Sequence, residues 1–232
     1  MKKTELVEIK KNNTGTGLLI ENDGYTSLPK SVIKEHMESD EWNVPYPFIV
    51  DAVFQKYGIK NANGRIYPKE VLMRQVELYQ QKINERRAIG ELNHPNESTI
   101  DLGRVSHNII ELHWESATLV GKMELNISQG FRKYGICSTL GDTTANLLLN
   151  GYKIGVSSRG VGSVEQKLGQ YIVGDDFELI CWDVVSDPST PGAYIGTHDE
   201  LQQYVESKET YGNAINETTQ SKISKIKSIL NS

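Results

Sequence analysis

Cysteine is nearly absent from this chain of 232 residues. Only Cys137 and Cys181 occur, and they do not form the CxxC spacing of a metal or redox motif. A disulfide framework or a zinc ribbon needs more cysteines at closer spacing. The sequence therefore argues against both kinds of scaffold and fits a protein of a reducing compartment.

A membrane span and a basic surface are also missing from the sequence. The segment MKKTELVEIKKNN begins basic but has no apolar segment, and no run approaches the roughly 20 apolar residues of a membrane helix. The net charge is −5, whereas nucleic-acid binding usually requires a basic face. We therefore expect a cytoplasmic protein with no membrane partner and no direct nucleic-acid partner.

The composition present is that of a packed globular protein. Hydrophobic residues make up 38% and charged residues 24% of the chain, as in ordinary soluble domains. The length suits one sizeable core with appendages. We expect a loosely structured N-terminal arm over residues 1–45, with one strand near the apolar TGLLIE and little chemistry. A core should follow over residues 46–197, and a helical tail over residues 198–232.

The core pattern alternates strand and helix signals. Apolar residues before the Asn-Gly turn at 63–64 predict a strand, and Pro68 with apolar residues at helical spacing predicts a helix over 68–87. A short strand should end at Pro95, and residues 104–114 and 117–127 should form a hairpin. A helix after Asp142 and further strands within 153–185 complete an α+β pattern dominated by sheet.

The segment GVSSRG, residues 155–160, places two serines between glycines directly after an apolar run. Strand alternation sends Ser157 and Ser158 to opposite faces, so only one of them can be a nucleophile. The pattern alone does not choose between them. The glycines permit close approach of a substrate backbone, and Arg159 could face an oxyanion. A simple turn is the other interpretation of this segment.

A histidine and an aspartate offer the remaining parts of a nucleophilic site. His94 ends the predicted strand before Pro95, where an imidazole can act as a base near neutral pH or serve a structural role. Asp183 alternates with apolar residues, which places its carboxylate in a row with Phe177, Leu179, Cys181 and Val185. A buried carboxylate needs a partner, which either a His–Asp hydrogen bond or a salt bridge would supply.

A metal site is the weaker alternative. His107 and His113 face the same way as Glu111 on a predicted strand, but that face also fits the solvent side of a half-buried strand. A metal-dependent hydrolase using His94, His107 and Asp101 would be sensitive to chelators. We expect neither a metal nor another cofactor.

Four motifs together resemble one family. The segments NGRIYPKEVL, RAIGELNHP, GVSSRGVGSV and WDVVSDPS, in this order, resemble the prohead core proteases of T-even-type tailed phages over roughly residues 45–195. The resemblance implies that Ser157 is the nucleophile, His94 the base and Asp183 the third member of a triad. It also implies that Arg159 and Gly160 belong to the oxyanion loop.

The same resemblance implies a fold and a role. The fold would be a mostly antiparallel, β-barrel-like core with surrounding helices, as in herpesvirus assembly proteases. The enzyme would act in the host cytoplasm inside the assembling prohead, where it cleaves scaffold or core proteins, the major capsid protein and itself. A homo-oligomer is left open. The alternative is a catalytically silent scaffold-binding or structural head protein of the same fold.

Self-cleavage has a predicted position. Family members prefer an apolar residue two positions before a glutamate and cleave after the glutamate. The segment INE fits this preference and predicts cleavage after Glu217, in the polar link before the terminal helix. Such a cut would remove that helix.

Overall fold

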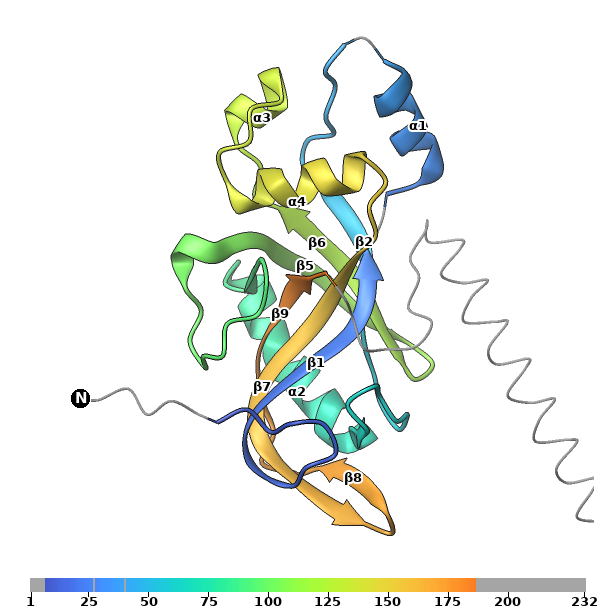
Figure 1. Ribbon diagram of the computed structural model, residues 1–232, viewed down its shortest axis with the longest axis vertical. Helices are drawn as coiled ribbons and strands as arrows, with labels where there is room; N and C mark the ends of the chain where they lie inside the picture. Colours follow the sequence, from blue (N-terminus) through green and yellow to red (C-terminus); the bar gives the residue numbers. More distant parts are fainter. Residues whose placement is uncertain (1–6, 27, 40, 187–232) are drawn as a thin grey trace, which may run out of the picture. The chain divides into compact units, whose positions relative to one another are not determined.

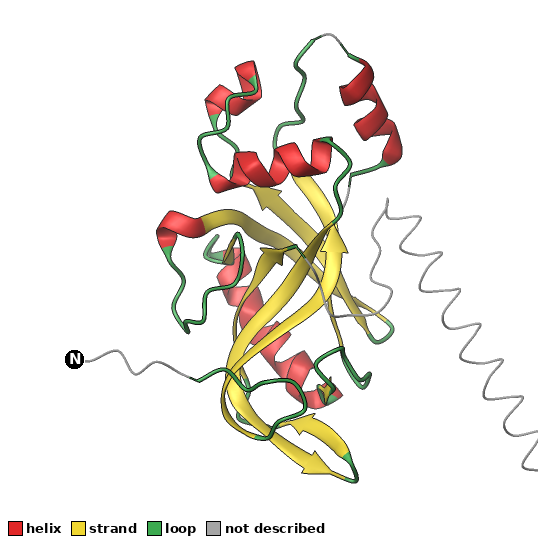
Figure 2. Ribbon diagram, viewed as in Figure 1, coloured by secondary structure: helices red, strands yellow, loops and turns green. Residues whose placement is uncertain are grey.

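The computed structural model describes residues 7–26, 28–39 and 41–186 of the chain. This part is an α+β fold with two sheets and helices packed around them (Figures 1 and 2). The strands are β1 (Gly15–Thr26), β2 (Ile49–Lys56), β3 (Arg65–Ile66), β4 (Ile89–Glu91), β5 (Val105–Glu115), β6 (Thr118–Leu125), β7 (Ile154–Lys167), β8 (Gln170–Val173) and β9 (Glu178–Val185). The helices are α1 (Lys30–Glu38), α2 (Lys69–Asn84), η1 (Leu102–Arg104), α3 (Gln129–Tyr134) and α4 (Leu140–Leu149).

Strand β7 lies at the centre of the five-stranded sheet. It pairs antiparallel with β1 along one edge, and with β9 and then β8 along the other. Because it has neighbours on both sides, the first seven residues of β7, Ile154 to Gly160, are all buried. The sequence pattern predicts shorter separate strands here, whereas the structure has one continuous strand of 14 residues.

The second sheet has four strands in the order β2-β6-β5-β4. Its β5–β6 hairpin turns at Ser116, which has a positive φ of 53°, and this confirms the predicted hairpin. The two sheets approach each other where β4 runs toward β9, through the bridge between Leu92 and Val184. The sheets also meet where β1 packs against β2. Within the described residues the strands form two separate hydrogen-bonded sheets and do not close into a barrel, which corrects the barrel-like expectation.

Helices α2 and α4 form where the sequence pattern predicts them, with small differences at their ends, whereas α1 and α3 were not predicted. Helix α2 follows Pro68 and buries its apolar stripe against β5 and β9. Helix α4 begins one turn earlier than predicted, because Thr139 is the N-cap and Asp142 completes a capping box at the third helical position. Gly151 follows with φ +79°, as expected for a left-handed residue after a helix.

Helices α1, α3 and α4 gather at one end of the sheets, and the β7–β8 hairpin extends at the other end (Figure 1). Aromatic rings pack together in the core around Trp182. The Trp182 ring meets Tyr79 and Phe54 edge-on, with ring centroids 4.9 Å and 5.5 Å away. Such edge-to-face contacts add stabilisation beyond area burial, and they hold β9 against α2 and β2.

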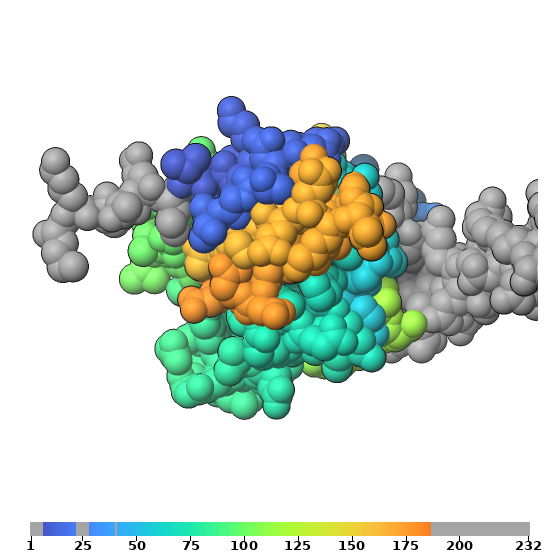
Figure 3. All heavy atoms as spheres, turned by 90° about the horizontal axis from the view of Figure 1, so that it is seen from below, coloured from blue at the N-terminus to red at the C-terminus, as the bar shows by residue number. Residues whose placement is uncertain are grey.

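The N-terminal region contributes a core strand. The sequence predicts an arm with one strand here; that strand, β1, instead belongs to the core, because it pairs with β7 along eleven residue pairs and buries Leu18 and Leu19 completely. Figure 3 shows this segment, in blue, lying directly against the β7–β8 region. Residues 7–9 add a further short contact along β1, through hydrogen bonds between Ile9 N–H and Leu18 C=O and between Leu18 N–H and Val7 C=O.

The predicted helical tail over residues 198–232 and the predicted cleavage site at Glu217 lie outside the described residues. Among the described helices, none is long and apolar enough to cross a membrane.

Candidate active site

The pairing of β7 with β9 places Ser157 directly opposite Asp183. Residues opposite each other in an antiparallel pair project to the same face of the sheet, with Cβ atoms about 5 Å apart. Ser158 pairs with Trp182 and therefore belongs to the other face. The register of two strands thus separates two serines that look equivalent in the sequence.

His94 reaches this face on the loop that follows β4. Gly90 permits the approach, because a Cβ there would lie 2.1 Å from the Trp182 carbonyl oxygen on β9. The Asn93 N–H then donates to the Val184 carbonyl at 2.8 Å, which anchors the loop one residue before His94. The glycine in AIGELNHP therefore allows the loop carrying His94 to lie against the strand carrying Asp183.

The three side chains form a connected chain of hydrogen bonds. His94 Nδ1 donates to Asp183 Oδ2 at 2.8 Å, and His94 Nε2 contacts the Ser157 hydroxyl. The Ser157 and Asp183 side chains are fully buried, and the His94 side chain is 11% exposed. We call Ser157, His94 and Asp183 the candidate triad. Because Nδ1 carries the proton toward Asp183, Nε2 is free to accept the serine proton.

Asp183 is held as a carboxylate despite its burial. Burial acts to raise its pKa, but the hydrogen bond and charge of His94, the charge of Arg159 and the Glu91 N–H together lower it below its ordinary value. The Glu91 N–H donates to Asp183 Oδ1 at 2.9 Å. Both partners considered from the sequence, a histidine and a salt bridge, are therefore present. An ionised Asp183 can hold the imidazole in one tautomer and stabilise it when charged.

The Ser157 hydroxyl has a second neighbour that no sequence pattern indicated. It contacts the backbone carbonyl oxygen of Glu21 on β1, next to the residue pair Asn22–Ser157. The β1–β7 register shifts by one residue between Asn22 and Gly24, so the strand bulges just past this point. A peptide carbonyl from the chain's own N-terminal strand therefore lies against the hydroxyl of the candidate triad.

The side chain of Glu21 is fully buried and enclosed by donors from one short segment. Arg65 Nη1 lies 2.6 Å from Oε1, and the Tyr67 hydroxyl donates to the same oxygen at 3.1 Å. Asn61 and Asn63 each donate a side-chain N–H to Oε2 at 2.7 Å. We call Asn61, Asn63, Arg65 and Tyr67 the glutamate pocket. It supplies the cation and the hydrogen bonds that a buried carboxylate requires.

The signal for this pocket was present in the sequence. In NANGRIY, the odd-numbered positions 61, 63, 65 and 67 all carry a donor side chain. The Asn-Gly pair predicts only a turn, and Gly64 does have the positive φ, +82°, of such a turn. Four alternating donors around a turn are more than a turn needs, and this excess could have indicated a binding site.

Arg159 and Gly160, predicted in the oxyanion loop, lie in other surroundings. The Arg159 guanidinium is buried against Asp183, Glu91 and two loop carbonyls. Gly160 belongs to the opposite face of β7 from Ser157, and a Cβ there would lie 2.4 Å from the Phe177 ring. Gly160 therefore allows Phe177 to pack on the strand.

The predicted row of residues along β9 is interrupted. The β7–β9 register shifts between Arg159 and Gly160, so Cys181 faces Arg159 whereas Leu179 faces Gly160. A β-bulge of this kind moves the residues beyond it to the other face. Asp183 and Cys181 share a face as expected, but Leu179 and Phe177 do not continue their row.

The two cysteines do not offer an alternative nucleophile. Burial raises the pKa of the Cys181 thiol well above its ordinary value, and the charge of Asp183 adds to this. Burial, slight as it is, also raises the pKa of the exposed Cys137 thiol. Nucleophilic cysteines instead have lowered pKa values. Neither thiol has the electrostatics of a cysteine protease.

The residues considered for a metal site have other roles. His107 is fully buried, with Nδ1 2.9 Å from the Ser106 hydroxyl and Nε2 donating to the Trp182 carbonyl at 3.1 Å, so it does not lie on a solvent face. His113 is exposed and pairs with Glu111 and Glu115. In the part of the chain that the structure describes, no cluster of His, Cys, Asp and Glu could hold a metal ion.

His107 should make stability depend on pH. Burial lowers its pKa to about 4, although the charge of Asp183 and the Trp182 carbonyl act in the opposite direction. Between pH 6.5 and 4 the unfolded chain binds a proton that the native His107 does not, so native stability falls as pH falls through this window. The full contribution, about 3 kcal/mol, is present only above pH 6.5.

The measurement is the free energy of unfolding in urea at pH 7, 5.5 and 4.5 for the wild type and for His107→Gln. Glutamine can still donate to the Trp182 carbonyl but does not titrate. We expect the difference between the two proteins to shrink as the pH falls. A difference that stays constant with pH would contradict this role of His107.

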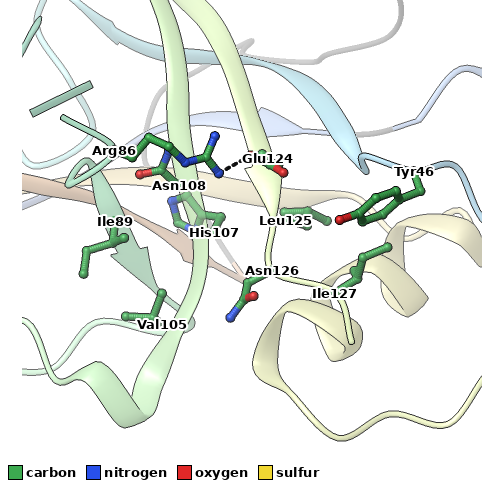
Figure 4. Close-up of a pocket in the computed structure, with 10 residues that line it drawn as sticks. All are labelled: Tyr46, Arg86, Ile89, Val105, His107, Asn108, Glu124, Leu125, Asn126 and Ile127. Carbon is green, nitrogen blue, oxygen red and sulfur yellow. Dashed lines mark hydrogen bonds and ion pairs between the residues drawn. The ribbon is translucent and has the colours of Figure 1, made fainter. Parts of the chain in front are cut away.

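A separate cavity of about 280 Å³ lies where β6 ends and β5 begins (Figure 4). Figure 4 shows Arg86 paired with Glu124 on one side of it, and His107 among the residues that line it. Its lining contains no member of the candidate triad or of the glutamate pocket. This cavity is therefore not part of the candidate active site.

A family model and a known relative both match this chain. The family model described as prohead core protein serine protease matches residues 18–208, a range that includes the candidate triad and Glu21. The prohead core protein protease of Enterobacteria phage T4 is 31% identical over 149 residues, which are 63% of this chain and 66% of that protein. The present chain thus spans just under two thirds of the length of that relative.

A solved structure agrees in fold. The bacteriophage T4 capsid assembly protease, gp21, matches with a TM-score of 0.58 and 25% identity, covering 75% of this chain and 99% of that chain. The family model extends over most of the present chain, from β1 to beyond β9. This protein therefore belongs to the family of prohead core protein serine proteases.

Proposed function

We propose that this protein is a serine endopeptidase that cleaves scaffold and capsid proteins, and itself, during phage head maturation. The observation that carries the proposal is the position of the Ser157 hydroxyl, in contact with the His94 imidazole and with the Glu21 carbonyl oxygen. A nucleophile, a base oriented by a buried carboxylate, and a peptide carbonyl are the parts that acyl transfer requires. The names of the two relatives support the setting, an assembling prohead.

The reaction follows from the hydrogen-bond directions. Ser157 Oγ forms a bond to the carbonyl carbon of the substrate while its proton moves to His94 Nε2, and the carbonyl oxygen becomes an oxyanion. Collapse breaks the C–N bond, and His94 gives the proton to the leaving amine. Water then attacks the acyl-enzyme, His94 takes a water proton, and the acid product leaves as Ser157 regains its hydrogen. Asp183 stabilises the charged imidazole in both halves. The chemistry calls for no cofactor.

The glutamate pocket supports cleavage after glutamate. The residue whose carbonyl contacts Ser157 is Glu21, and its carboxylate has four donor side chains around it. Leu19, two positions earlier, is apolar and fully buried. The segment Leu19-Ile20-Glu21 therefore fits the preference that the family resemblance implies.

Strand β1 accordingly serves as a substrate bound in place. A substrate strand would pair antiparallel with β7 as β1 does, with backbone hydrogen bonds supplying affinity and the glutamate pocket supplying selectivity. We propose self-cleavage between Glu21 and Asn22, which would free β7 for scaffold and capsid substrates. Self-cleavage after Glu217 stays a separate prediction from the sequence.

A catalytically silent binding protein of the same fold is the competing class. It would keep the antiparallel pairing of a strand with β7 but would not need an imidazole between a buried carboxylate and a hydroxyl. The hydrogen bond from His94 to Asp183 at 2.8 Å favours the enzyme.

The test is incubation of the full chain, alone and with prohead scaffold proteins, followed by mass spectrometry of the products. We expect cleavage after glutamates that follow an apolar residue by two positions, including a new N-terminus at Asn22. The matched control is Glu21→Lys. This variant should not be cut after position 21, but it should still cleave other substrates. Intact scaffold and an intact chain under all conditions would favour the silent binder.

A further inference from the structure

Arg159 occupies the interior of the site without contacting the reacting atoms. Its side chain is fully buried two residues after Ser157, on the same face of β7. Nε lies 2.9 Å from Asp183 Oδ2, the same oxygen that accepts the His94 hydrogen bond. Nη2 lies 3.3 Å from Asp183 Oδ1, so the guanidinium spans both carboxylate oxygens. Two sides of one carboxylate are thus fixed, one by the imidazole and one by the guanidinium.

The same guanidinium holds a second buried carboxylate. Arg159 Nη2 lies 2.9 Å from Glu91 Oε1, and the Glu91 side chain is fully buried. Arg104, at the surface, pairs with the other Glu91 oxygen at 3.0 Å. Charges therefore alternate from Asp183 through Arg159 and Glu91 to Arg104. Two buried carboxylates this close would be costly without the cation between them.

Arg159 and Glu91 also hold the loop that carries His94. Arg159 Nη1 donates to the carbonyls of Glu97 at 2.9 Å and Thr99 at 3.3 Å. Glu91 Oε1 accepts from the Asp101 N–H at 2.9 Å. Residues 93–101 form an irregular connection between β4 and η1, without the backbone hydrogen bonds of a helix or strand. The hydrogen bonds from the Arg159 and Glu91 side chains therefore hold this connection in place.

We propose that Arg159 is a positioning residue, which with Glu91 fixes the orientation of Asp183 and the course of the His94 loop. It acts on the reaction through these two members of the candidate triad and not as a side-chain donor to the oxyanion. Only a planar guanidinium can serve both carboxylates and the loop carbonyls at once, because its donors form a rigid fork. The inference rests on the proposed function for its kinetic readout, but its spectroscopic readout is independent of catalysis.

The kinetic test compares Arg159→Gln and Arg159→Lys with the wild type on a peptide containing Leu-Ile-Glu-Asn. We expect kcat to fall about 100-fold in Arg159→Gln, the scale of a small misplacement of catalytic groups, with KM changed less than about 3-fold. Arg159→Lys keeps a charge beside Asp183 but not the fork, so its loss should be smaller, about 10-fold. Arg74→Gln, which removes an exposed guanidinium on α2, is the matched control and should leave kcat unchanged.

The spectroscopic test follows the His94 Nδ1 proton by NMR of ¹⁵N-histidine-labelled full chain. It is done in the Ser157→Ala background, so that the chain stays intact. We expect Arg159→Gln to move or broaden this low-field resonance, because the accepting Asp183 oxygen loses its second partner. Unchanged kcat, or reduced kcat with an unchanged His94 resonance, would overturn the proposal, and the second outcome would indicate direct action on the oxyanion.

Two results separate this inference from the proposed function. If the wild type cleaves nothing, the proposed function fails, whereas the His94 resonance still reports whether Arg159 orients Asp183. If Arg159→Gln does not fold, as judged by thermal unfolding, both readouts are taken on Arg159→Lys and Glu91→Gln. Wild-type values in both of these variants would likewise overturn the proposal.

Discussion

Ser157→Ala should reduce kcat on a glutamate-containing peptide by about 10⁶-fold, the loss typical of removing the nucleophile of a serine triad. The reason is that no other described hydroxyl contacts His94 Nε2. The native strand pairing does not depend on the hydroxyl, so the variant should fold and remain uncut at Glu21. Peptide hydrolysis and circular dichroism measure the two effects.

Ser158→Ala is the matched control for this prediction. Ser158 is equally buried and lies one residue away, but its position opposite Trp182 puts it on the other face of the sheet. Its replacement should change kcat by less than about 10-fold, because it lies away from the candidate triad. Activity retained by Ser157→Ala and lost in Ser158→Ala would reverse the assignment of the nucleophile.

Arg65→Gln should remove most of the preference for glutamate before the cleaved bond. In the wild type we expect kcat/KM for a Leu-Ile-Glu-Asn peptide to exceed that for Leu-Ile-Gln-Asn by about 100-fold, because glutamine leaves the buried Arg65 charge without its partner. In Arg65→Gln the glutamate peptide should lose about 100-fold, since its carboxylate is then buried without a cation. The glutamine peptide should change little.

The ratio of the two kcat/KM values is the measurement, because a general loss of activity cancels in it. Arg86→Gln, which removes an exposed guanidinium paired with Glu124, should leave the ratio unchanged. A preference for glutamate that survives in Arg65→Gln would show that selection lies outside the glutamate pocket. Self-cleavage at Glu21 should slow in parallel in the full chain.

Local patterns predicted much of the fold. The β5–β6 hairpin, helix α2 and the left-handed residue after α4 each depend on residues close in sequence, so alternation, helical spacing and turn chemistry were sufficient to place them. The role of strand β1 in the core was not predicted because its paired residues on β7 lie 128 to 149 residues away along the chain. The arrangement of the strands in two sheets depends on such distant pairings. The family resemblance implied a barrel-like fold and did not predict this arrangement.

Only some of the site residues could be predicted, because their contacts join strands that are distant in sequence. Period-two alternation correctly separated Ser157 from Ser158, but which of them meets His94 depends on the register of β7 with β9. The resemblance implies that Arg159 belongs to the oxyanion loop, whereas its side chain contacts Glu91 and Asp183, on two other strands. Glu21 could not be connected with the site from a pattern in residues 1–45, because only its long-range contacts give it a role.

The most direct test of the account is to identify which residue a fluorophosphonate probe labels. The full chain, first incubated to allow processing, is treated with the probe, digested and mapped by mass spectrometry. We expect a single labelled residue, Ser157, and labelling that is lost in His94→Ala. Labelling of Ser158 or of another residue, or labelling of Ser157 that is as fast without His94, would contradict the assignment of Ser157 and His94 as nucleophile and base.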